Sequence, residues 1–215
     1  MALTLNSSTR VLFIGDSITD CGWQEDPEKI GSGYVRLIRD FLLAKAPAAA
    51  PKVFNRGISG NKIPDLQNRW QRDVLDLAPD ILSIYIGIND VWHGLAFDRQ
   101  GCDIDSYRAG YEDILRQTKR AIPKITLVLC EPSVLWLKDH PGANDKLIPY
   151  VRAVHQLADE FDATAVVGLH EAFENARLAR PEIAWTSDGV HPTSIGHMLI
   201  ARTWLSAAGI AMDRF

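Results

Sequence analysis

The sequence predicts an α/β protein, a three-layer α/β/α sandwich with a mainly parallel five-stranded sheet. Short strand-like runs alternate with longer helix-like segments along the whole chain. The strand-like runs are almost continuously apolar, as in "ILSIYI" at residues 81–86, and such strands are typical of a parallel sheet that helices cover on both faces. The length of 215 residues suits one domain over residues 1–215, large enough to bury its core without disulfides or a structural metal.

The predicted strands are runs too short for a buried helix. They lie at residues 10–14, 52–55, 81–86, 125–129 and 163–167. The predicted helices have apolar residues spaced three and four apart. They lie at residues 33–46, 63–77, 104–121, 145–161 and 194–208. In the first helix Val35, Ile38 and Leu42 share one face, and Pro47 ends the helix.

The composition is that of a soluble globular protein and argues against two classes of partner. Apolar residues make up 47% of the chain and charged residues 23%, without a long run of either sign. The net charge of −4 offers a nucleic acid no overall attraction. No apolar run approaches the roughly 18 residues that span a bilayer, so we expect no membrane partner.

The N-terminal stretch and the cysteines favour a cytoplasmic location. The chain starts with "MALTLNSSTR", which lacks the charged start and apolar run of a secretory signal. Cys21, Cys102 and Cys130 are widely spaced and odd in number, which favours reduced thiols over disulfides. Neither cysteines nor histidines have the spacing of a metal site. We therefore expect a cytoplasmic protein without bound metal, unless a leader has been trimmed from this chain.

Polar loops that contain glycine follow the predicted strands, at the sheet edge where ligands bind in this architecture. The first strand is followed by "GDSITD", the second by "RGISGN" and the third by "GINDVWHG", and the last helix is preceded by "SDGVHP". Ser17 in the first loop is either a nucleophile or an ordinary turn or N-cap residue. The surrounding residues are not the Gly-x-Ser-x-Gly elbow of the α/β-hydrolases, because Thr19 stands two residues after Ser17.

Asp188 and His191 form a candidate acid-histidine pair. A tight turn at Gly189 would let the carboxylate contact the nearer imidazole nitrogen, as in a catalytic triad. The alternative is an Asp-Gly turn with a surface histidine, followed by Pro192 at a helix start.

Gly60 and Asn89 are candidate oxyanion donors. A glycine lets its backbone N–H approach a substrate closely, and an asparagine amide is a neutral donor. A tight turn at Gly60 and a turn or cap at Asn89 are the alternatives. A phosphate-binding loop is weakly supported, because the lysine and hydroxyl spacing of a Walker A motif is missing. Separate structural explanations for all five candidates are improbable.

Together these motifs resemble those of the SGNH hydrolases, also called the GDSL family of esterases and lipases. The four invariant positions of that family match Ser17 in "GDSIT", Gly60 in "NRGISGN", Asn89 in "GIND" and His191 in "DGVHP". The one departure is Ile18, where the family name has leucine. The motifs occur in the order of the family and span nearly the whole chain, so the resemblance implies an SGNH-type, flavodoxin-like fold.

The resemblance also implies a reaction. Ser17, Asp188 and His191 correspond to the catalytic triad. The backbone N–H groups of Ser17 and Gly60 and the side-chain amide of Asn89 correspond to the oxyanion hole. Neither a metal nor an organic cofactor is needed.

The finer resemblance is to the acetylxylan esterases of this family. It rests on "GDSITDCG", "GYV", "GISGN", "RW", "GINDVW" and the late "AW…VHP…GHM". It implies a serine esterase for short acyl groups that deacetylates xylo-oligosaccharides or related sugars through an acyl-enzyme. Its substrate is then a small-molecule or oligosaccharide acyl ester, and self-association into a homo-oligomer agrees with similar enzymes.

Trp92 and Trp185 flank the candidate loops and either stack on a sugar or pack beneath the loops, and His93 is a candidate for the mouth of the site. The alternatives are a broader carboxylesterase, a thioesterase or a lysophospholipase, and a carbohydrate-binding protein without activity. A phosphoesterase ranks below these, because clustered metal ligands and a basic cradle are missing. Residues 95–180 show no diagnostic motif.

Overall fold

A five-stranded, all-parallel sheet forms the centre of the computed structural model, which describes residues 3–96 and 100–212. The strands are β1 (Arg10–Gly15), β2 (Lys52–Gly57), β3 (Ile81–Tyr85), β4 (Thr126–Cys130) and β5 (Ala165–Val167). Their order across the sheet is β2-β1-β3-β4-β5. Every predicted strand is present, and the predicted parallel sheet is confirmed.

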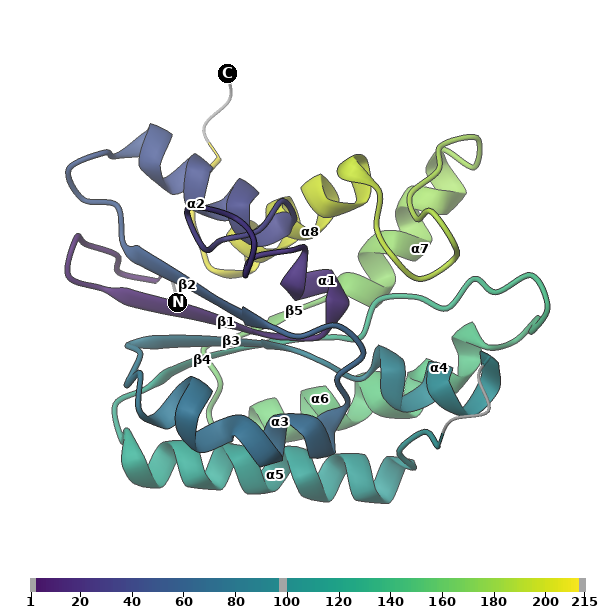
Figure 1. Ribbon diagram of the computed structural model, residues 1–215. Helices are drawn as coiled ribbons and strands as arrows, with labels where there is room; N and C mark the ends of the chain where they lie inside the picture. The colour runs from purple at the N-terminus through teal and green to yellow at the C-terminus, as the bar shows by residue number, and fades with distance from the viewer. Residues whose placement is uncertain (1–2, 97–99, 213–215) are drawn as a thin grey trace.

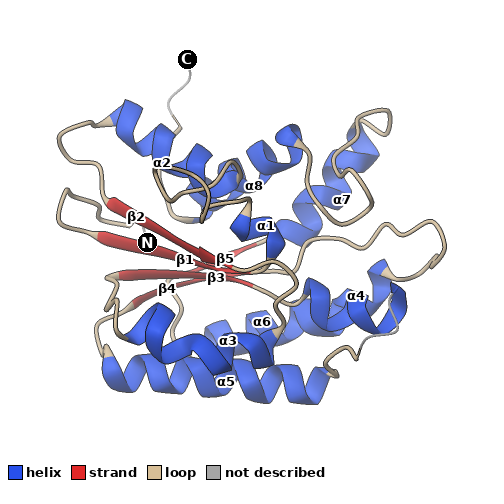
Figure 2. Ribbon diagram, viewed as in Figure 1, coloured by secondary structure: helices blue, strands red, loops and turns tan. Residues whose placement is uncertain are grey.

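Helices cover both faces of this sheet, which confirms the three predicted layers (Figures 1 and 2). One layer contains α2 (Tyr34–Lys45), α7 (Leu169–Ala179) and α8 (Ser194–Ala207). The other layer contains α3 (Ile63–Trp70), α5 (Ile104–Ala121) and α6 (Ile148–Glu160). Two shorter helices, α1 (Ser17–Asp20) and α4 (Ile88–Ala96), follow β1 and β3 directly. They lie at the right-hand end of the strands in Figure 1.

Several helices differ from the predicted ones. The helix predicted at residues 63–77 is α-helical only to Trp70 and continues as a π-helical turn, Gln71–Leu75, which keeps both Trp70 and Val74 buried. The helix predicted at residues 145–161 opens with a 3-10 turn, Asn144–Leu147, before α6. Pro149 lies in the first turn of α6, where its missing N–H costs no helical hydrogen bond.

Three helices were not predicted at all. α1 and α4 are short segments of mixed polarity whose sequence is typical of loops, and α1 is capped by the side chain of Asp16. α7 carries a usable signal, since Leu169 and Phe173 lie four residues apart and are both fully buried.

The core lies on both faces of the sheet. Residues 11–14 are at most 1% exposed, and every residue of β3 is buried. The two faces also hold polar pairs, such as the Trp204 indole N–H that donates to Ser83 Oγ (3.0 Å). Among the described residues, no helix combines the length and apolarity needed to cross a bilayer.

The strand register places the loops that follow β1, β2 and β3 side by side. Gly15 at the end of β1 pairs with Gly57 of β2 and with Tyr85 of β3. The loops after these three strands therefore leave the sheet at the same level. This places the candidate residues of the three loops close to one another at one edge of the sheet.

Candidate active site

Ser17 lies at the carboxyl end of β1, as the first residue of α1. The preceding Asp16 caps this helix, because its Oδ1 accepts a hydrogen bond from the backbone N–H of Ile18 (3.0 Å). The cap fixes the turn that presents the Ser17 side chain. Ser17 Oγ lies 3.0 Å from Nε2 of His191, within hydrogen-bond distance, although the two residues are 174 positions apart in the sequence.

Asp188 holds the other nitrogen of the His191 ring. Asp188 Oδ2 lies 2.7 Å from His191 Nδ1, and Asp188 Oδ1 accepts the backbone N–H groups of Val190 (3.0 Å) and His191 (2.8 Å). Partial burial raises the pKa of Asp188, but these hydrogen bonds outweigh it and lower the pKa below its usual value. An ionised carboxylate can only accept, so Nδ1 carries a proton and Nε2 is free to take one from Ser17.

The turn between these two residues requires glycine. Gly189 has φ of +90°, and a Cβ atom there would lie 2.4 Å from the backbone oxygen of Trp136. The backbone N–H of Trp136 donates to the carbonyl of Gly189 (2.9 Å). The loop after β4 therefore packs directly on the Asp188–His191 turn and supports its position.

The loop after β2 is tied to the loops on either side. The backbone N–H of Ile58 donates to the carbonyl of Gly15 (3.1 Å). The side-chain amide of Asn89, in the first turn of α4, donates to the carbonyl of Asn61 (3.1 Å). Gly60 lies between these contacts with φ of +81°. The structure thus brings Gly60 and Asn89 to the same sheet edge as Ser17.

These three residues offer donors that the protein does not fully use. Within the described part of the chain, the backbone N–H groups of Ser17 and Gly60 donate no hydrogen bond. The Asn89 amide has two N–H groups, and one hydrogen bond is formed, to Asn61. The arrangement can therefore offer neutral donors to a negatively charged oxygen beside Ser17.

Arg69 of α3 connects these loops through its buried side chain. In the sequence it is part of the "RW" motif of the finer resemblance, with no role predicted for it. Its side chain is 8% exposed. The guanidinium donates to the carbonyls of Arg56 (2.8 Å) and Gly15 (3.1 Å) and to Oδ1 of Asn61 (2.8 Å), and it pairs with Asp73 (2.8 Å). Only arginine has a rigid fork that can reach acceptors in several directions.

Two buried carboxyl groups lie next to the candidate residues. Burial, and to a smaller extent the negative charge of Asp90, raises the pKa of Asp16, beside Ser17, to about 7. Burial also raises the pKa of Asp90, beside Asn89, to about 7. Near neutral pH these carboxyls are partly protonated, and the protonated form places no negative charge next to a developing oxyanion.

The three predicted substrate-binding residues lie in different surroundings. The Trp92 ring meets the His191 ring edge-on, with centroids 5.6 Å apart. His93 is buried and packs against Trp92, at 6.4 Å between ring centroids. The Trp185 indole N–H donates to the carbonyl of Arg180 (3.1 Å). Of the three, Trp92 lines the cavity described next.

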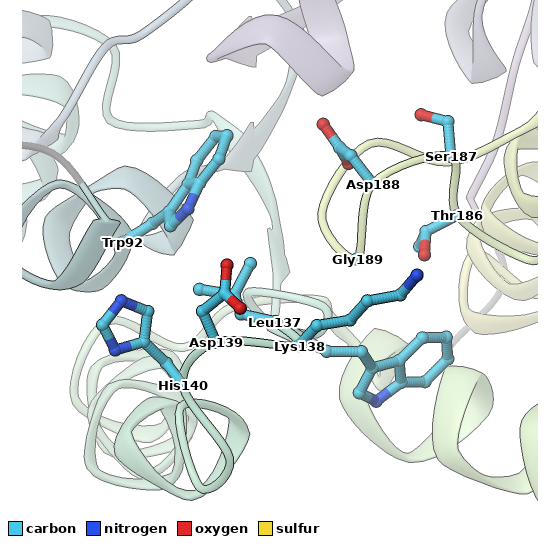
Figure 3. Close-up of a pocket in the computed structure, with 10 residues that line it drawn as sticks. Trp92, Leu137, Lys138, Asp139, His140, Thr186, Ser187, Asp188 and Gly189 are labelled. Atoms are coloured by element: carbon cyan, nitrogen blue, oxygen red, sulfur yellow. The ribbon is translucent and has the colours of Figure 1, made fainter.

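A cavity of about 570 Å³ opens beside the Asp188–His191 turn (Figure 3). One wall is formed by the turn itself, at residues 186–189, and Trp92 stands opposite. The third wall is the loop after β4, residues 136–140, where the sequence showed no motif. Among the described residues, no group of three or more His, Cys, Asp or Glu side chains is arranged to hold a metal ion.

Comparisons with known proteins find sequence relatives along nearly the whole chain. The model of the GDSL-like Lipase/Acylhydrolase family matches residues 13–199. An acetylxylan esterase from Geobacillus stearothermophilus is 36% identical, with 99% of both chains aligned.

Solved structures agree with the sequence matches. The crystal structure of a putative GDSL-like lipase from Parabacteroides merdae superposes with a TM-score of 0.90 at 35% identity, covering 98% of this chain and 100% of the other. That of the Geobacillus acetylxylan esterase gives 0.88 at 33% identity, covering 99% of each chain. Three further structures of that esterase are described as catalytic mutants, with alanine in place of a serine, an aspartate or a histidine.

Proposed function

The chain belongs to the GDSL-like lipase/acylhydrolase family and is a carboxylic ester hydrolase, and on that premise we propose that it removes acetyl groups from xylo-oligosaccharides or related sugars. The observation that carries the proposal is the hydrogen-bonded series Ser17, His191 and Asp188 at the carboxyl edge of the sheet. The same three residue types have been replaced in the catalytic mutants of the Geobacillus esterase.

In the first half of the proposed reaction the acetyl group moves to the protein. Ser17 Oγ attacks the carbonyl carbon while His191 Nε2 takes the hydroxyl proton. The charge on the carbonyl oxygen is stabilised by the N–H groups of Ser17 and Gly60 and by the Asn89 amide. The bond to the sugar oxygen then breaks, His191 returns the proton to that oxygen, and the acetyl group remains on Ser17.

In the second half water removes the acetyl group. His191 takes a proton from the water as its oxygen attacks the acetyl carbonyl, and the same donors stabilise the second oxyanion. The ester bond to Ser17 breaks, Ser17 regains its proton from His191, and acetate leaves. Asp188 stays ionised throughout and stabilises the imidazolium that forms in each half.

An acetate-release assay with acetylated xylotriose tests this function. We expect release by the unmodified protein, and a loss of at least about a thousandfold in kcat for Ser17→Ala, because the nucleophile is removed. An unchanged rate for purified Ser17→Ala would contradict the assignment of Ser17 as the nucleophile. Absence of acetate release by the unmodified protein would favour the carbohydrate-binding alternative.

Acyl-chain preference separates acetyl esters from the broader alternatives. The proposal predicts a higher kcat/KM for 4-nitrophenyl acetate than for 4-nitrophenyl octanoate, because an enzyme that removes acetyl groups does not need the extended apolar groove that an octanoyl chain would occupy. A preference for the octanoyl ester would favour a lysophospholipase or a long-chain thioesterase.

A further inference from the structure

The cavity of Figure 3 lies on the histidine side of Ser17. Its lining includes Asp188 and Gly189 of the turn that carries His191, together with Trp92, whose ring contacts the His191 ring. Ser17, Gly60 and Asn89 are not among the described residues that line it, and His191 borders it only through Trp92 and through the turn at Asp188 and Gly189. In acyl transfer the leaving alcohol must take its proton from the histidine, whereas the carbonyl oxygen faces the oxyanion donors. The cavity is therefore placed to receive the alcohol part of the ester.

The wall formed by residues 136–140 is held firmly. The Trp136 indole N–H donates to Oε1 of Glu174 (2.7 Å), and Arg177 stacks on the Trp136 ring at 4.8 Å. Asn144 reinforces the wall, since its amide donates to Glu174 (2.9 Å) and its oxygen accepts the backbone N–H of Leu135 (2.9 Å). The side chains that follow Trp136 are thus presented by an anchored loop.

Two adjacent charged side chains project from this wall. Lys138 extends its ammonium group toward Thr186, and the Asp139 carboxylate points into the space between Trp92 and Asp188 (Figure 3). Neither side chain forms a hydrogen bond or an ion pair with another described residue. A donor and an acceptor are therefore both available to a ligand, beside the flat ring of Trp92.

The charges of the lining select among alcohols. Asp139 and Asp188 place two carboxylates against the one ammonium of Lys138, which disfavours an anionic alcohol such as a phosphate-bearing glycerol. A long apolar alcohol would displace the water that hydrogen-bonds to these charged groups and would offer no hydrogen bonds in its place. A neutral sugar can supply hydroxyl groups to both charges and an apolar ring face to Trp92. The volume of about 570 Å³ is that of an ordinary small-molecule site.

We propose that this cavity is the subsite for the leaving sugar, and that Lys138 and Asp139 determine specificity by binding its hydroxyl groups. The inference rests on the proposed deacetylation and adds the residues that distinguish a sugar ester from a simple ester. It predicts that these two side chains matter for the sugar substrate and not for an ester whose leaving alcohol has no hydroxyl group besides the esterified one.

The test compares two double variants on two substrates. Lys138→Met with Asp139→Asn removes both charges, and Lys124→Met with Asp159→Asn makes the same changes at exposed positions away from the cavity. We expect kcat/KM for acetylated xylotriose to fall by roughly tenfold or more in the first double variant, mostly through KM, because hydrogen bonds to charged groups are lost. With 4-nitrophenyl acetate, whose leaving group has no hydroxyl besides the esterified one, the change should stay below about twofold. The control double variant should match the unmodified protein on both substrates.

The other outcomes overturn the inference in distinguishable ways. If the unmodified protein cleaves both substrates and the first double variant loses neither activity, or loses both equally, the subsite is wrong while the proposed function stands. If the unmodified protein cleaves 4-nitrophenyl acetate but releases no acetate from the sugar, the proposed function fails, and the sugar subsite fails with it.

Discussion

His197 is a partly buried imidazole that the proposed reaction does not use. Its Nδ1 accepts the backbone N–H of Tyr34 (3.2 Å), which ties α8 to the start of α2, and its Nε2 lies 3.6 Å from Sγ of Cys21. Protonation of Nδ1 would break the first contact. Burial, and to a smaller extent the charge of His191, lowers the pKa of His197 to about 4.

The lowered pKa of His197 predicts that the free energy of unfolding decreases in acid. The folded-state pKa of His197 lies below the ordinary histidine pKa of 6.5, so the unfolded chain binds the proton first as the pH falls. The contribution of His197 is present above about pH 6.5 and is lost as the pH falls toward 4. Between about pH 7.5 and 4.5 we expect His197→Gln to lose about 2 kcal/mol less free energy of unfolding than the unmodified protein.

Urea titrations at the two pH values measure the difference, with His140→Gln at an exposed position as the control. The raised pKa values of Asp16 and Asp90 make the free energy of unfolding increase as the pH falls, which is the opposite dependence. All three proteins contain both residues, so this contribution cancels in the comparison. Equal losses in His197→Gln and the unmodified protein would refute the buried neutral state of this imidazole.

Among the helices, α3 has the clearest link to the reaction, through Arg69. The guanidinium fixes Asn61, and the carbonyl of Asn61 in turn holds the amide of Asn89. We expect Arg69→Met to lower kcat by roughly 10- to 100-fold with little change in KM for 4-nitrophenyl acetate, because the oxyanion donors lose their alignment. The free energy of unfolding should also fall by roughly 3 kcal/mol, since a buried ion pair is broken.

Two further variants separate positioning from general destabilisation. Arg69→Lys keeps the charge but not the fork, so it should recover stability more than kcat. Arg116→Met removes an exposed ion pair with Glu112 and should leave kcat unchanged. If Arg69→Met, measured well below its unfolding temperature, keeps the full kcat, Arg69 has only a structural role.

The sequence predicts some helices more accurately than others. Long helices with a regular apolar face, such as α2 and α5, could be placed within a few residues, because one buried stripe decides their position. The short helix α4 could not, since its first turn is positioned by contacts from Asn89 to Asn61 that are distant in sequence. α7 was missed although Leu169 and Phe173 signalled it.

At the level of the whole molecule, the parallel topology of the sheet explains why the candidate site could be predicted from the sequence. A parallel sheet gathers the ends of its strands at one edge, so Ser17, Gly60 and Asn89 could be assigned to one region from sequence motifs alone. The cavity wall at residues 136–140 could not be anticipated. Its position depends on Glu174 and on the Gly189 carbonyl, which come from segments far along the chain.

The central claim is that Ser17 is the nucleophile, and covalent labelling tests it most directly. Treatment with diethyl 4-nitrophenyl phosphate, followed by tryptic digestion, isolates residues 11–29, in which Ser17 and Thr19 are the only hydroxyl side chains. We predict one diethylphosphoryl group per chain, located on Ser17 by fragmentation, with activity lost in proportion to labelling. Complete loss of activity with Ser17 unlabelled, or with the label on another residue, would contradict the account.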